Sequence, residues 1–248
     1  MSRKLVFILA IAAGSATMGT GVASAQTDTT FCNAAFEVDR TLAALGDKPK
    51  TAAIDRVRTA LTPLEATAPP ELTAEVSAFT GAIRSALDSR DDPTTEPTFS
   101  DDAAAVNAYR FSSCAYQVAD VTLLEYEFTG LPKTFQPGVV AFRVTNTGTE
   151  VHELALARLR TAEAFRKSLG RDEDEQRSKL RYVAQTLVEP DATNYLFVEV
   201  KAGRYGAACH IPTGTESVDD LEGGGGHGHG DDAEPHWEEG MLSTFRVS

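Results

Sequence analysis

Four side chains in the C-terminal half of the chain have the types and spacing of one metal site. Cys209 ends the stretch GRYGAAC, His236 and Met241 stand close together in PHWEEGM, and His152 lies upstream in NTGTEVHEL. Thiolate and thioether sulfur suit Cu(I), while imidazole accommodates both oxidation states of copper. A Cys with two His and a weak axial Met is therefore the ligand set of an electron-transfer copper, and we predict that these residues bind one copper ion.

Each of these assignments has an alternative that the sequence leaves open. Cys209 would otherwise be an ordinary buried thiol, and His152 a buried neutral histidine with a hydrogen-bond partner. His210 lies on the opposite side of an extended chain from Cys209, so we do not expect it to be a ligand. His227 and His229 could bind Cu(II) or Zn(II) loosely, and a passive linker is an equally good interpretation of their Gly-rich stretch.

The elements that must position these ligands are strands, because the apolar residues alternate with polar ones from Val118 onward. The stretches VTLLEYEF, VVAFRVTN, NYLFVEV and GRYGAAC have this pattern. In EVHELALARL, His152 shares its side of the strand with Leu154 and Leu156. Its imidazole is therefore predicted to point into the interior.

Two segments interrupt the strand pattern. Residues 161–187 mix acidic and basic residues with a few apolar ones, which predicts a helical insertion with a solvated face. Residues 222–235 include GGGGHGHGDDAEP, which cannot pack a core, and we predict a flexible Gly/His/acidic loop.

This arrangement resembles the cupredoxins, the type 1 (blue) copper proteins. The matching pieces are the turn Asn146-Thr147-Gly148 followed by His152, the stretch AGRY leading to Cys209, and His236 with Met241 before a closing strand, Leu242 to Val247. The His-x4-Met spacing is that of plastocyanin-like members. Two features depart from the family pattern: about 26 residues separate Cys209 from His236, and Glu153 replaces the small polar residue that often follows the first His.

The resemblance implies a plastocyanin-like, Greek-key β-sandwich over residues 117–248. Such sandwiches bring distant loops together at one end, so His152 can meet the other three ligands. It also implies a copper that cycles between Cu(I) and Cu(II), a redox partner protein that the sequence does not identify, and no enzymatic activity. A multicopper oxidase needs several His pairs to build its trinuclear cluster, and the five His of this chain argue against that class.

The N-terminal half has helical periodicity, which predicts a small helical domain at residues 27–116. Leu72, Val76, Phe79 and Ile83 recur at helical spacing after two prolines that are typical of a helix start. Three cysteines in an exported chain suggest one disulfide and one thiol kept for another purpose. We pair Cys32 with Cys114 and leave Cys209 for the metal, which makes the overall fold class α+β with two domains.

The first 25 residues read as a secretory signal peptide cleaved after Ala25, because basic residues precede an apolar run and then Ala23-Ser24-Ala25. The run is too short for a comfortable membrane span, so a retained N-terminal anchor is the lesser alternative to cleavage. Removal of this segment leaves 21 basic and 36 acidic residues, a net charge of −15, which disfavours binding to nucleic acid.

The sequence thus predicts an exported copper-binding electron-transfer protein that neither spans a membrane nor catalyses a reaction. The alternatives are a metal-free cupredoxin-like interaction module and an extracytoplasmic protein that stores or delivers copper.

Overall fold

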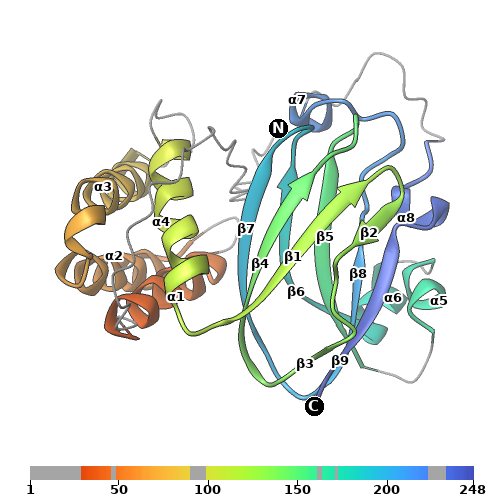
Figure 1. Ribbon diagram of the computed structural model, residues 1–248, viewed down its shortest axis with the longest axis horizontal. Coiled ribbons are helices and arrows are strands. Elements are labelled where there is room, and N and C mark those ends of the chain that lie inside the picture. Colours follow the sequence, from red (N-terminus) through yellow and green to blue (C-terminus); the bar gives the residue numbers. More distant parts are fainter. Residues whose placement is uncertain (1–28, 46–48, 90–98, 161–163, 171–172, 223–232) are drawn as a thin grey trace. The chain divides into compact units, whose positions relative to one another are not determined.

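The described residues form two compact units that divide between Ala115 and Tyr116 (Figure 1). The computed structural model describes residues 29–45, 49–89, 99–160, 164–170, 173–222 and 233–248. The first unit is helical and the second is a β-sandwich, which confirms the predicted α+β fold class. The predicted signal peptide, residues 1–25, and both His227 and His229 lie outside the described residues.

Helices make up the first unit, as the apolar periodicity predicts. They are α1 (Thr29–Ala43), α2 (Thr51–Ala66), the short 3-10 helix η1 (Pro70–Leu72), α3 (Thr73–Ser89) and α4 (Phe99–Ser113). The stripe at Leu72, Val76, Phe79 and Ile83 is buried, and the ring of Phe79 stacks on that of Phe99 at 5.6 Å. Within the described residues, no helix is both long and apolar enough to cross a membrane.

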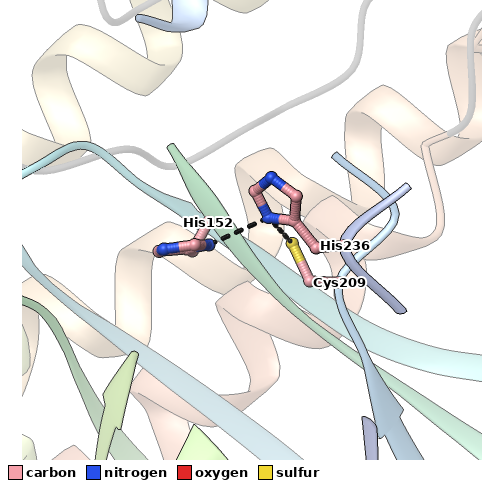
Figure 2. Close-up of side chains that lie close together, drawn as sticks. All are labelled: His152, Cys209 and His236. Carbon is pink, nitrogen blue, oxygen red and sulfur yellow. Dashed lines mark hydrogen bonds between the residues drawn. The ribbon is translucent and has the colours of Figure 1, made fainter. Parts of the chain in front are cut away.

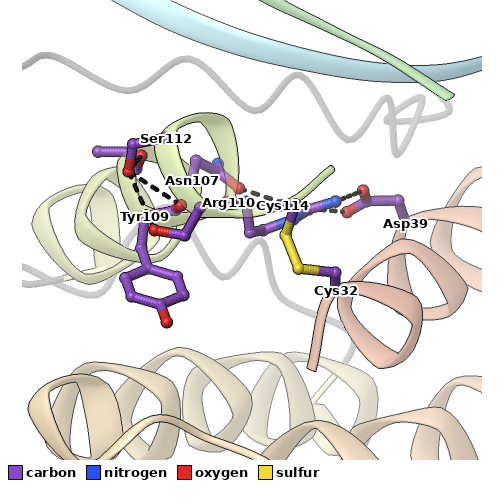
Figure 3. Close-up of a disulfide and its surroundings, with 9 residues drawn as sticks. Cys32, Asp39, Asn107, Tyr109, Arg110, Ser112 and Cys114 are labelled. Carbon is purple, nitrogen blue, oxygen red and sulfur yellow. Dashed lines mark hydrogen bonds and ion pairs between the residues drawn. A yellow bond between two sulfur atoms is a disulfide. The ribbon is translucent and has the colours of Figure 1, made fainter. Parts of the chain in front are cut away.

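A disulfide between Cys32 and Cys114 joins the first helix of this unit to the end of the last (Figure 3), and the prediction of this pairing is confirmed. Beside it, the buried Arg110 is ion-paired with Asp39 and donates to Asn107 Oδ1 at 3.0 Å. The bond closes a loop with a sequence separation of 82 residues, so it removes much conformational entropy from the unfolded chain. The third cysteine, Cys209, is free and buried.

Replacement of both Cys32 and Cys114 by Ser is expected to lower the free energy of unfolding of the helical unit by about 4 kcal/mol, because the unfolded chain regains the entropy of the open loop. Urea titration followed by far-ultraviolet circular dichroism measures the effect. The fluorescence of Trp237, the one tryptophan of the chain, reports on unfolding of the β unit. The urea midpoint of that transition is expected to stay unchanged. An unchanged helical midpoint would contradict the prediction.

Two sheets form the second unit (Figure 1). One has the order β2-β1-β4-β7 and the other the order β3-β9-β8-β5-β6. The strands are β1 (Gln117–Leu124), β2 (Glu127–Thr129), β3 (Thr134–Phe135), β4 (Gly138–Asn146), β5 (His152–Leu159), β6 (Leu180–Val188), β7 (Thr193–Val200), β8 (Gly203–Ala208) and β9 (Leu242–Val247). β1 runs parallel to β4 and β3 parallel to β9, while the other pairs are antiparallel.

Alternating side chains of the two sheets fill the core of the sandwich. Val140, Phe142 and Val144 on β4 are fully buried, as the period of two predicts. Phe135 packs edge-on against both Phe142 and Phe245. These contacts join strands of the two sheets.

The helical insertion is shorter than predicted. Helices α5 (Phe165–Leu169) and α6 (Glu173–Lys179) occupy its first part, but residues 180–187, predicted as part of the helical insertion, belong to strand β6. β6 pairs antiparallel with β5 over its whole length. The stretch LRYVAQTLV is rich in β-branched and aromatic residues, and long-range pairing with β5 prevails there over local helical spacing.

Candidate metal centre

A turn between β4 and β5 places His152. The buried Asn146 donates through its side-chain amide to the carbonyl oxygens of Glu150 at 2.7 Å and Val188 at 2.9 Å, and its own oxygen accepts from Gly148 N at 2.9 Å. These bonds fix the backbone that leads into β5. His152 is the first residue of that strand and its side chain is fully buried.

Backbone pairing brings Cys209 and His236 together, although a long Gly-rich and acidic segment separates them in the sequence. Cys209 directly follows β8, and its carbonyl accepts from Trp237 N at 2.9 Å, while Ile211 O accepts from His236 N at 2.9 Å. Thr213 N donates to Glu234 O at 2.9 Å, and Pro212 and Pro235 form an isolated β-bridge. Residues 209–213 and 234–237 therefore lie side by side, although 27 positions separate the two predicted ligands.

The end of the one-turn helix α8 (His236–Glu239) sets the place of Met241. Gly240 follows this helix with φ of 121°, a conformation that glycine adopts without steric cost. The chain then turns back, so that Met241 N donates to His236 O at 2.9 Å and Met241 O accepts from Cys209 N at 3.2 Å. The side chain of Met241 is fully buried.

Three donor atoms meet in the interior of the β unit (Figure 2). His152 Nδ1 lies 3.0 Å from His236 Nδ1, and His236 Nδ1 lies 3.3 Å from Cys209 Sγ. All three ligand atoms are within 4.8 Å of one another. The structure thus brings together three of the four predicted ligands by their side chains, and ties the backbone of the fourth, Met241, to two of them.

Burial disfavours charge on the side chains of this cluster. It lowers the pKa of His152 from 6.5 to about 4, with a further contribution from the nearby His236. It also lowers the pKa of His236, against the opposing hydrogen bond to Glu150. Both imidazoles are therefore neutral at pH 7, and neutral imidazole is the form that binds a metal ion.

The sulfur of Cys209 is surrounded by backbone donors. Glu153 N donates to Sγ at 3.2 Å. Burial raises the pKa of the thiol to about 12, while hydrogen bonds from the backbone of Glu153 and Ile211 act in the opposite direction. These N–H groups point at the atom that becomes a thiolate when a metal cation binds, so they favour the ligating form.

Several polar neighbours of the ligands were not found by sequence reasoning. Glu150 Oε2 lies 2.8 Å from His236 Nε2. Glu153 Oε2 lies 3.1 Å from His210 Nδ1, and Tyr182 Oη lies 2.9 Å from His210 Nε2. His210 is therefore held outside the group of donor atoms. The only signal in the sequence was that Glu150 and Glu153 stand close to His152. In a chain with 36 acidic residues, such proximity to a histidine is expected by chance.

Helix α5 covers the strand that leads to Cys209. Phe165 packs directly on Gly206 of β8, where any side chain would collide with its ring. Arg166 donates to the carbonyl oxygens of Trp237 at 3.1 Å and Glu238 at 2.7 Å. The helical insertion thus holds the segment that carries His236 in place.

Comparison with known proteins gives matches in structure alone. No protein-family model matches the chain, and no curated protein matches it in sequence. A reduced auracyanin from Roseiflexus castenholzii matches with 13% identity over 54% of this chain and 98% of its own, with a TM-score of 0.35. Auracyanin A, a blue copper protein from Chloroflexus aurantiacus, matches with 18% identity over 52% of this chain and 99% of its own, with a TM-score of 0.30.

A copper-containing nitrite reductase from Thermus scotoductus also matches, with 12% identity over 57% of this chain and 33% of its own, and a TM-score of 0.29. The auracyanin matches fall on the C-terminal half, where the residues that resemble the cupredoxins lie.

The metal-free protein is expected to lose stability as the pH falls below about 6.5. In that range the unfolded chain binds a proton at His152 that the folded protein excludes, because the pKa of His152 in the folded protein is about 4. This group alone removes about 1 kcal/mol of the free energy of unfolding by about pH 5.5 and about 3 kcal/mol by about pH 4. Urea titrations across this range measure the loss, and the variant His152→Gln should lack this part of it. Equal pH dependence in both proteins would contradict the pKa of His152.

Deletion of residues 223–230 is expected to leave the affinity for Cu(I) unchanged, because the pairing of Thr213 with Glu234 closes the chain between the deleted segment and the ligands. The variant Thr213→Pro, which removes the donating N–H, should weaken Cu(I) binding instead. Competition with a coloured chelator measures both affinities. Loss of binding in the deletion variant would show that a ligand lies within the deleted residues.

Proposed function

We propose that the chain is an exported electron-transfer protein in which His152, Cys209, His236 and Met241 bind one copper ion in a type 1 site. The observation that carries this proposal is the convergence of one thiol and two imidazole nitrogens within 4.8 Å in the interior. A Cys and two His with a weak axial Met match the ligand set of blue copper sites. Copper held in such a site supplies reversible one-electron transfer between Cu(I) and Cu(II).

The burial of the ligands favours electron transfer over catalysis on a substrate. All four side chains have 0% exposed surface, so the protein offers neither water nor a small molecule an open coordination position. Rigid backbone pairing on both sides of Cys209 and His236 restricts rearrangement between oxidation states. The chain's own residues thus exclude solvent and hold the donors in place, which is what a redox carrier needs.

Two features support export. The disulfide between Cys32 and Cys114 is typical of proteins in oxidising compartments. Residues 1–25 resemble a signal peptide that would be cleaved after Ala25. We infer an extracytoplasmic protein that exchanges electrons with a partner protein.

The copper-loaded protein is expected to show an intense visible thiolate-to-Cu(II) charge-transfer band, and Cys209→Ser should abolish it because oxygen does not replace the sulfur donor. Met241→Leu should retain copper and raise the reduction potential, because the weak axial donor to Cu(II) is lost. Absorption and electron paramagnetic resonance spectra, with redox titration, measure these effects.

The double variant Cys32→Ser/Cys114→Ser is the matched control, since it removes two sulfur atoms and should keep the colour. A colourless protein without tightly held copper would refute the proposal and would favour a metal-free interaction module with the same fold. Tight binding of Cu(I) without a reversible redox couple would favour copper storage or delivery.

A further inference from the structure

The outer nitrogen of His236 faces a carboxylate that fixes its proton. Glu150 Oε2 lies 2.8 Å from His236 Nε2 and also accepts from Gly214 N at 2.7 Å. Because Oε2 already accepts from Gly214 N, it faces His236 as an acceptor, so Nε2 of His236 carries the hydrogen. The other nitrogen, Nδ1, then presents its lone pair to the donor cluster, which is the state that a metal ligand requires.

The neighbouring imidazole must then have the opposite tautomer in the metal-free protein. His152 Nδ1 lies 3.0 Å from His236 Nδ1, and two neutral rings share a hydrogen bond only if one of them donates. Because His236 Nδ1 accepts, His152 Nδ1 carries the hydrogen. Its Nε2 atom is left unprotonated, and it is indeed one of the buried polar atoms without a hydrogen-bond partner among the described residues.

A second carboxylate lies close to that unpartnered atom. Glu125 Oε1 is 4.0 Å from His152 Nε2, beyond hydrogen-bond distance. Glu125 accepts from the backbone N of Thr149 and, at 3.4 Å, from that of Glu150. It packs against Gly148, where a Cβ atom would collide with the carboxylate. The turn before His152 thus keeps an acceptor close to its outer nitrogen.

We propose that Glu150 and Glu125 are positioning residues for the two imidazole ligands, and that Glu125 takes a hydrogen bond from His152 only when a metal is bound. This inference rests on the proposed function for the identity of the ligands. To ligate through Nδ1, His152 loses the proton on that atom and gains one on Nε2, by exchange with solvent, so the ring stays neutral. Glu125 then accepts the new Nε2–H, while Glu150 holds His236 in one tautomer throughout.

Imidazole ¹⁵N spectra of the metal-free and Cu(I)-loaded protein test this assignment, with signals identified from single His variants. In the metal-free protein we expect the proton on Nε2 of His236 and on Nδ1 of His152. With Cu(I) bound, both rings should be protonated at Nε2. The proposal would be overturned if His236 carried its proton on Nδ1 in the metal-free protein. It would also be overturned if His152 carried no proton on Nε2 in the Cu(I)-loaded protein.

Variants separate the two carboxylates. Glu150→Leu should remove the tautomer preference of His236 already in the metal-free protein, whereas Glu125→Leu should change neither metal-free ring. Both should lower Cu(I) affinity roughly 10- to 100-fold. Glu150→Gln and Glu125→Gln, whose amide oxygens still accept hydrogen bonds, should retain most of the Cu(I) affinity of the unsubstituted protein. Glu127→Gln, on an exposed residue close to Glu125 in sequence, is the matched control and should match the unsubstituted protein.

Unchanged tautomers and affinity in the Leu variants would overturn the positioning roles. The result is separable from the proposed function. An unsubstituted protein that binds no copper refutes that function, and its metal-free spectra then decide the assignment of Glu150 by themselves. A protein that binds copper with the wrong tautomers keeps the function and refutes this inference.

Discussion

The candidate metal centre depends on one backbone interaction, the pairing of the segment after β8 with the segment that enters α8. Three hydrogen bonds between residues 209–213 and 234–237 hold the thiol of Cys209 and the imidazole of His236 in one place. Without them the two side chains would be joined only through the intervening chain, and the entropy of closing that loop would oppose their meeting. With these bonds in place, the group of three donor atoms is completed by His152, the first residue of β5, which the turn between β4 and β5 positions.

Much of this arrangement could be read from residue types. Alternation of apolar side chains indicated the strands and the inward direction of His152, and three cysteines in a chain with a predicted export signal indicated the disulfide of the helical unit. The neighbours of the ligands could not be read in the same way. Glu125 is far from His152 along the chain and reaches it through the fold, and β6 replaced a helix because its partner strand lies elsewhere in the sequence. Such features depend on long-range contacts that local patterns do not contain.

Burial of the site has an energetic consequence. Two imidazoles and a thiol are removed from water and find hydrogen bonds chiefly with one another and with adjacent backbone, and one ring nitrogen finds none. Buried polar atoms without partners cost free energy. The metal-free fold therefore carries a local destabilisation that ligand binding relieves, since a ligand that binds the folded state stabilises it.

Gly206 shows how the helical insertion and the ligand strand constrain each other. The ring of Phe165 occupies the space where a side chain at position 206 would lie, and the next residue, Arg166, holds the carbonyl groups after His236. Positions 165 and 206 are therefore not free to change independently during evolution. A larger residue on the strand requires a smaller one on the helix, and loss of the aromatic ring at position 165 would leave a cavity in the buried cluster against which Trp237 packs.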